Sequence, residues 1–242
     1  MSEQMRLDRY LTLCGAGSRS ESKKFIISGL VYVNGRVCRD PAAKVHSSTD
    51  EILLEDNVLL YEPFVYILMN KPTGVICATY DRYHATVLDL LQGEYAHRDL
   101  APVGRLDIDT TGLLLLTDDG VLTHALLAPK RHVPKTYEAT LAHSISEDDI
   151  QAFAQGITLS NFVAQSAQLR PLDGSDGTRV EVTLHEGKFH QVKRMFLARN
   201  NEVLTLKRTT FGALTLDEEA LPAGQWRKLE AEEVERLRTA PV

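Results

Sequence analysis

The sequence has 242 residues, 43% of them hydrophobic and 25% charged, which is typical of a folded globular protein with one large or two smaller domains. It contains no apolar stretch as long as a membrane span and does not begin with a signal peptide, so we expect a cytoplasmic protein with no membrane association. Three widely spaced cysteines and eight histidines without ligand spacing predict neither a disulfide framework nor a metal site.

The net charge of −6 is unevenly distributed along the chain. Residues 1–44 carry eight Lys/Arg and four Asp/Glu, and residues 185–210 carry six and two, so each segment has a charge of +4. The other segments, residues 45–184 and 211–242, each carry a net negative charge. Two basic segments in an acidic body are compatible with local binding of phosphate groups, although a basic helix face is more often simply solvated.

The first predicted elements form a small module of two helices and a hairpin. Residues 5–14 (MRLDRYLTLC) place apolar side chains at i, i+3, i+4 and i+7, which predicts a helix with one buried face. Residues 18–21 (SRSE) have the form of a capping box, so a second helix should begin there and end near Gly29. Asn34-Gly35 between two apolar runs predicts a two-residue hairpin turn.

The R-L-D-R-Y-L and V-Y-V-N-G strings of this module resemble the S4 RNA-binding domain over about residues 5–50. The resemblance implies that basic side chains on the two helices and the hairpin contact structured RNA: Arg6, Arg9, Arg19, Lys23, Lys24 and Arg36. A small α+β packing module with solvated charges is the alternative. We expect this domain over residues 1–60 and a second domain over residues 63–242.

The second domain is predicted to be a sheet of short strands with a few amphipathic helices. Strands are predicted at residues 65–69, 113–116, 135–141 and 178–184, and helices at 86–91, 121–127, 147–155 and 189–199. The helix at 189–199 should turn Phe189, Val192 and Phe196 inward. The fold class is therefore α+β, with an S4 (αL-like) module followed by a mixed, largely antiparallel sheet.

The most informative stretch is residues 104–120, GRLDIDTTGLLLLTDDG, in which a carboxylate in a polar turn precedes a buried strand. Asp residues in turns commonly bond backbone amides, which is the simple structural alternative. The whole string, however, resembles the catalytic motif of pseudouridine synthases of the RsuA type. The resemblance implies that Asp107 is the essential carboxylate, and we assign Asp109 to turn geometry. Residues 70–74 (NKPTG) match the same family.

The resemblance also assigns roles to other residues. Arg105 would hold a phosphate or fill the space left by the flipped base, and Tyr137 of the K-T-Y motif would stack on uracil. In the string EGKFHQVKRM (186–195), Lys193 would lie against Asp107 and favour its ionised form. Leu184 would pack on the base. The RNA-facing edge would comprise Lys188, His190 and Arg194.

The implied activity is isomerisation of a uridine in 16S ribosomal RNA to pseudouridine, without cofactor or metal, by a monomer acting on ribosomal RNA or on a small-subunit assembly intermediate. Asp107 would act as a nucleophile at C1′ or as a base at C2′, and both roles remain open. The alternatives are a 23S rRNA synthase of the same family and a non-catalytic ribosome-assembly RNA-binding factor. A glycoside hydrolase is a further alternative, disfavoured because Asp107 has no obvious acidic partner in the sequence.

Overall fold

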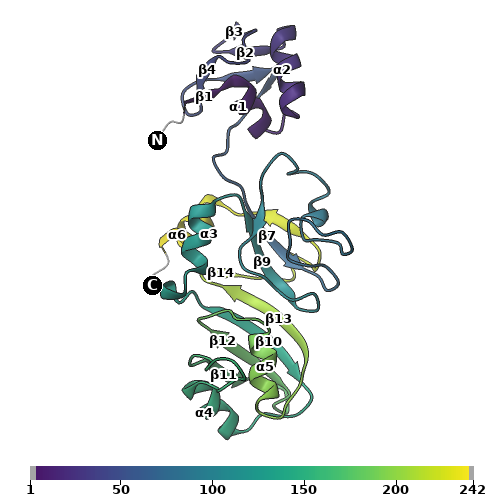
Figure 1. Cartoon of the computed structure of the whole chain (residues 1–242), viewed down its shortest axis with the longest axis vertical. Helices are drawn as coiled ribbons and strands as arrows, with labels where there is room; N and C mark the ends of the chain where they lie inside the picture. The colour runs from purple at the N-terminus through teal and green to yellow at the C-terminus, as the bar shows by residue number, and fades with distance from the viewer. Residues whose placement is uncertain (1–3, 240–242) are drawn as a thin grey trace. The chain divides into compact units, whose positions relative to one another are not determined.

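The computed structural model describes residues 4–239, and the backbone separates into two compact units (Figure 1). The first comprises Met1–Val65 together with Gly93–Asp99, and the second comprises Tyr66–Gln92 and Leu100–Val242. No helix among residues 4–239 combines the length and the apolar character needed to cross a lipid bilayer.

The first unit consists of two helices and short strands. Its elements are β1 (Gln4–Arg6), α1 (Leu7–Leu13), α2 (Arg19–Ser28), β2 (Val31–Val33), β3 (Arg36–Val37), β4 (Lys44–His46), β5 (Ile52–Leu54) and β6 (Asn57–Val58). Strands β1 and β4 pair, and the other four form a sheet of order β3-β2-β5-β6. Leu7, Leu11, Ile26 and Ile52 are completely buried in the core that the helices and strands enclose.

Two predictions for this unit are confirmed, and one needs correction. Ser18 and Glu21 form the complete capping box of α2, which ends at Gly29 with a positive φ. Asn34 and Gly35 both have positive φ, as the predicted hairpin turn requires. The predicted helix over 5–14 begins only at Leu7, because the residues before it pair with β4 as strand β1.

The segment Gly93–Asp99 belongs to the first unit although it lies within the second in sequence. Arg98 is almost fully buried, and its guanidinium donates to the carbonyl oxygens of Leu13, Glu62 and Pro63 at 3.0–3.3 Å. A buried guanidinium needs such acceptors, since an unpaired buried charge is costly. No sequence pattern predicted this attachment.

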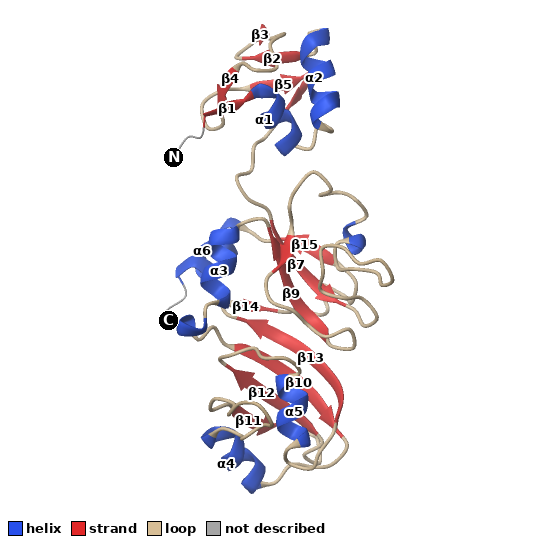
Figure 2. Cartoon of the chain, viewed as in Figure 1, coloured by secondary structure: helices blue, strands red, loops and turns tan. Residues whose placement is uncertain are grey.

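The second unit contains a nine-stranded sheet with helices packed on it (Figure 2). Its strands are β7 (Tyr66–Lys71), β8 (Ala101–Pro102), β9 (Thr111–Thr117), β10 (Lys135–Leu141), β11 (Gln168–Pro171), β12 (Arg179–Leu184), β13 (Val203–Phe211), β14 (Leu214–Thr215) and β15 (Trp226–Lys228). Its α-helices are α3 (Gly120–Leu127), α4 (Glu147–Gln155), α5 (Gln191–Leu197) and α6 (Ala231–Thr239), and its 3₁₀ turns are η1 (Asp89–Leu91) and η2 (Pro129–Arg131).

The main path through this sheet is β11-β12-β10-β13-β9-β7-β15, with β14 on β13 and β8 on β9. Within the described residues every strand pair is antiparallel except β9 with β13. The predicted mixed, largely antiparallel sheet is therefore confirmed. Residues 113–116 of β9 are completely buried, as a continuous apolar run at the centre of a covered sheet should be.

Two predicted helices differ from the structure. In place of a helix over 86–91 there is only the turn η1, which ends at Gln92, where the backbone is left-handed (φ 51°). The helix predicted over 189–199 begins at Gln191, since His190 has a left-handed backbone (φ 50°). Phe189 is 68% exposed rather than inward, and its ring stacks on that of His190.

Candidate active site

Residues 104–110 form a loop between β8 and β9 that presents Asp107 to a cavity. Leu106 anchors the loop: its side chain is buried, and its backbone N–H donates to the Sγ of Cys77 at 3.3 Å. The N–H of Thr110 donates to the carbonyl of Asp107, which closes the turn. Gly112 follows with φ 99°, where a Cβ would lie 2.3 Å from a backbone oxygen of Arg208, so only glycine fits.

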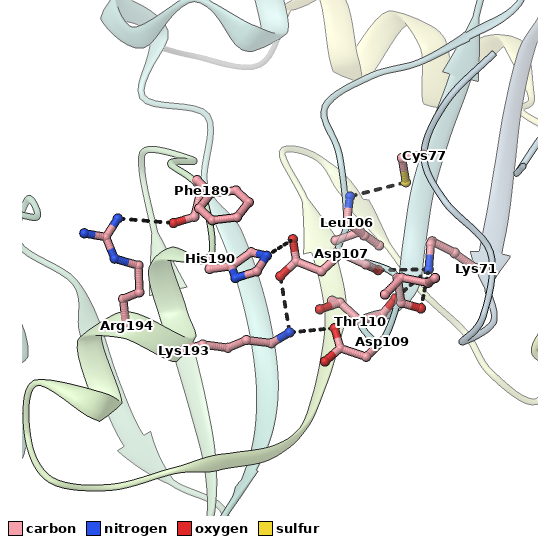
Figure 3. Close-up of polar contacts among 11 residues, drawn as sticks. Lys71, Cys77, Leu106, Asp107, Asp109, Thr110, Phe189, His190, Lys193 and Arg194 are labelled. Carbon is pink, nitrogen blue, oxygen red and sulfur yellow. Dashed lines mark hydrogen bonds and ion pairs between the residues drawn. The ribbon is translucent and has the colours of Figure 1, made fainter. Parts of the chain in front are cut away.

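A buried lysine, Lys71, holds this loop by hydrogen bonds to its backbone carbonyl oxygens. The Nζ of Lys71 donates to the carbonyl oxygens of Pro72 (3.0 Å), Asp107 (3.1 Å) and Thr110 (2.9 Å). The side chain is completely buried, and this burial lowers the pKa of Lys71. Lys71 lies in the N-K-P-x-G string, but no sequence argument assigned it a function. Its contacts fix the backbone of the loop from Asp107 to Thr110 (Figure 3).

The carboxylate of Asp107 lies between two basic side chains of the α5 region. Its oxygens are 3.3 Å from Lys193 Nζ and 3.5 Å from His190 Nε2 (Figure 3). The sequence predicted the lysine beside Asp107, whereas His190 was expected only at the RNA-facing edge. His190 has a left-handed backbone, and its ring faces the carboxylate. The ring of Phe189 stacks on it, with 3.7 Å between the two ring centres.

Asp109 does more than shape the turn to which it was assigned. Its Oδ1 accepts a hydrogen bond of 2.6 Å from Lys193 Nζ, shorter than the contact between Lys193 and Asp107. This bond lowers the pKa of Asp109. The side chain of Asp109 is 67% exposed and that of Asp107 is 27% exposed, so Asp109 lies on the solvent side of the shared lysine. Asp107 and Asp109 thus share Lys193, a connection that their spacing in the sequence did not predict.

The cavity in front of Asp107 has a volume of about 410 Å³, within the range of roughly 300–1,000 Å³ usual for ligand pockets. Tyr137 of β10 and Leu184 of β12 line it, and both are largely buried. Arg105 also lines it and is exposed, and its contact with substrate stays a prediction. The strands bring residues from three distant parts of the sequence to one cavity.

Two further basic side chains lie near this cavity, around the ring of Phe162. Lys188 Nζ is 3.9 Å and Arg194 Cζ is 5.1 Å from the ring centre. Lys188 lines the cavity, whereas the Arg194 guanidinium donates to Asn161 and to the hydroxyl of Ser160. Arg194 is therefore held by a neighbouring loop, and contact of either residue with RNA remains a prediction.

The six basic residues predicted to contact RNA in the first unit are all exposed. Arg6 differs from the others, since its guanidinium makes two hydrogen bonds to the Asp8 carboxylate, which raise the pKa of Arg6. Its charge is partly compensated. The remaining predicted contacts are Arg9, Arg19, Lys23, Lys24 and Arg36.

Comparison with known proteins places this arrangement in a family. The family model of RNA pseudouridylate synthases matches residues 65–198, and the S4 domain model matches residues 5–52. The chain belongs to the RNA pseudouridylate synthase family and carries an S4 domain at its front.

Similar proteins match over nearly their full length. An uncharacterized RNA pseudouridine synthase of Bacillus subtilis is 42% identical and is covered to 98%, with 96% of this chain aligned. The ribosomal small subunit pseudouridine synthase A of Yersinia pestis is 40% identical, with 95% of this chain and 97% of the relative covered. A solved crystal structure of a pseudouridylate synthase is 38% identical, with a TM-score of 0.67, and covers 96% of this chain and 99% of its own.

Proposed function

We propose that this chain converts one uridine of 16S ribosomal RNA to pseudouridine and that Asp107 is the reactive carboxylate. The observation that carries the proposal is the position of Asp107: it lies at a 410 Å³ cavity, between Lys193 and His190, with Tyr137 and Leu184 on the walls. Several relatives are named ribosomal small subunit pseudouridine synthase A, which favours the small-subunit RNA over the large.

The reaction breaks the bond between C1′ and N1, turns the base and joins C1′ to C5, after which C5 loses a proton and N1 gains one. A carboxylate can take part as nucleophile at C1′ or as base at C2′. In either role Lys193 places a positive charge 3.3 Å from one carboxylate oxygen, and His190 lies 3.5 Å from the other. The target base must first leave its stack, at a cost of a few kcal/mol. Tyr137 and Leu184 would then hold its two faces, and Arg105 an adjoining phosphate.

The exposed cations of the first unit would dock the RNA. Its two helices and hairpin present separated positive charges and no reactive cluster, which suits contacts with phosphates. We assign docking to residues 1–60 and chemistry to residues 63–242. Either naked ribosomal RNA or a small-subunit assembly intermediate would serve as substrate for a monomeric, cytoplasmic enzyme.

Mapping pseudouridines in ribosomal RNA tests the proposal. RNA from a strain lacking the gene would be treated with carbodiimide and read by primer extension, before and after incubation with the purified chain. We expect one new stop in 16S RNA with the wild-type chain. Asp107→Asn should bind the RNA but form product more slowly, by a factor of about 10² to 10⁴.

The other outcomes separate the alternatives. A stop in 23S RNA would identify the large-subunit substrate. Binding without any stop would identify a non-catalytic assembly factor. Wild-type turnover by Asp107→Asn would refute the role of Asp107 and leave the activity intact.

A further inference from the structure

Two buried cations line the cavity beside Tyr137. Lys135, at the start of β10, is 9% exposed, and Arg208, in β13, is 1% exposed. Both line the same cavity as Asp107. Lys135 and Tyr137 are two residues apart on the buried face of β10, and Arg208 is the partner of Tyr137 in the register with β13. The three side chains therefore share one face of the sheet.

Neither cation has a carboxylate partner. Lys135 Nζ donates to the carbonyl of Val133 at 2.8 Å, which leaves two of its three donor positions unassigned. Arg208 Nε donates to the carbonyl of Leu113, and its buried Nη2 has no hydrogen-bond partner among residues 4–239. Within the same residues no carboxylate oxygen lies within 4.0 Å of either cation. Instead, both cations lie over the ring of Phe211, at 5.5 and 5.0 Å.

The acidic groups that line the cavity are occupied elsewhere. Glu186 Oε1 accepts from the backbone N–H of Gln165 and from the side chain of Gln191. Asp107 faces Lys193 and His190. Burial, and secondly the charge of Arg208, lower the pKa of Lys135 to about 8. A buried, uncompensated cation destabilises the fold, so its presence suggests that a ligand supplies negative charge there.

We propose that Lys135 contacts a carbonyl oxygen of the uracil base and stabilises the negative charge which that base carries after its glycosidic bond breaks, with Arg208 as a second fixed charge behind it. The inference rests on the proposed function. When the C1′–N1 bond breaks, its electron pair leaves with the base and spreads over N1, O2 and O4. The charge is taken up when C5 bonds to C1′, and the base stays neutral afterwards because N1 gains a proton as the C5 proton leaves.

The surroundings favour the base over an RNA phosphate as the source of this charge. Lys135 lies among Leu184, Val133 and Phe211, which are apolar and suit the faces and edges of a planar ring. A phosphate keeps much of its hydration and remains part of the RNA backbone. It would meet the exposed Arg105 instead. Preorganised donors at a developing anion are among the largest contributions to catalysis.

A stability measurement separates this role from a structural one. Lys135→Met keeps the length of the side chain and removes the charge. We expect its melting temperature at pH 7 to equal or exceed that of the wild type, because a buried unpaired charge has been removed, while its single-turnover rate falls about 10- to 100-fold. Lys135→Arg should recover part of the rate. Lys207→Met, on the same strand as Arg208 but outside the cavity and paired with Glu218, is the matched control with an unchanged rate.

Sulfur substitution in the substrate identifies the contact. RNAs with 2-thiouridine or 4-thiouridine at the target weaken hydrogen bonding at one oxygen each. With one of them, the rate loss should be large for the wild-type chain and small for Lys135→Met, because the variant no longer makes that hydrogen bond. If sulfur substitution instead lowers the rate of Lys135→Met by the same factor as that of the wild type, for both thio substrates, then Lys135 contacts neither oxygen. That result would show the proposal to be wrong.

A binding measurement decides the inference even if no RNA is modified. 5-Nitrouridine, whose base ionises near neutral pH, would be compared with uridine, and neither nucleoside carries a phosphate. The wild-type chain should bind the anionic base about 10- to 100-fold more tightly than Lys135→Met does, with little difference for uridine. Equal affinities for 5-nitrouridine would overturn the cation's role. Absence of product from the wild-type chain would refute the proposed function instead.

Discussion

The basic residues of the first unit and those around the cavity differ in how they are held. Arg9, Arg19, Lys23 and Lys24 are exposed on a surface, whereas Lys71, Lys135 and Arg208 are buried and bond backbone carbonyl oxygens. Exposed cations are well suited to phosphates in many arrangements, because their contacts are screened and adaptable. Buried cations are costly, and they act at fixed atoms. The comparison suggests that one region supplies RNA affinity and the other chemistry.

The largest effect should follow from removing Lys71. Lys71→Met would leave three backbone carbonyls, those of Pro72, Asp107 and Thr110, without their buried donor. An unsatisfied buried group costs about 1–3 kcal/mol, so we expect a loss of unfolding free energy of at least that size and a large loss of activity. Urea denaturation and single-turnover assays would measure both. A variant as stable as the wild type would contradict the role of this lysine in holding the loop.

Lys135→Met provides a direct contrast with Lys71→Met, because both remove a buried ammonium. Below pH 8 the charged Lys135 destabilises the folded state, since the pKa of Lys135 is lowered to about 8 from its ordinary value of 10.5. Between these two pH values the unfolded chain binds more protons than the folded chain, so the wild type should gain stability relative to Lys135→Met as pH rises. Activity should fall above pH 8, where Lys135 loses its positive charge. Parallel stability curves for the two proteins would argue against a perturbed Lys135.

Replacing Tyr137 tests the wall of the cavity. The loss of activity should lie between the losses expected for the buried lysines and for the exposed cations of α2. Stacking of a base on an aromatic ring is worth about 1–3 kcal/mol. Tyr137→Phe keeps the ring and should bind RNA normally, with slower turnover if the hydroxyl assists removal of the C5 proton. Tyr137→Leu should be worse in both respects. If Tyr137 serves only core packing, the Phe variant will be as active as the wild type and the Leu variant will mainly lower the melting temperature.

The smallest effect on chemistry should come from the exposed cations of α2. Replacing Arg19, Lys23 and Lys24 together by Gln should weaken rRNA binding. It should also lower the slope of log binding constant against log salt concentration, in magnitude, by about 0.7–0.9 for each phosphate that is no longer neutralised. The single-turnover rate at saturating RNA should be unchanged. Filter binding across a salt series would measure the slope. An unaltered slope would show that these residues are merely solvated.

The sequence by itself determined the local features of this protein. The capping box at Ser18 and Glu21, the turn at Asn34-Gly35 and the continuous apolar run of β9 follow from short-range rules of hydrogen bonding, backbone conformation and burial. The long G-R-L-D motif likewise pointed to the family and to Asp107. In each case the deciding residues lie within about one turn or one strand of each other.

Only the tertiary structure decided which distant groups meet. Lys71 reaches the carbonyl of Asp107 from 36 residues away, and Lys193 reaches Asp109 from 84 residues away. Arg208 is buried where β13 runs beside β9, and its guanidinium bonds the carbonyl of Leu113 from 95 residues away. Such contacts depend on the path of the whole chain, since sequence spacing constrains neighbours along a helix or strand but not the strands that fold back beside them.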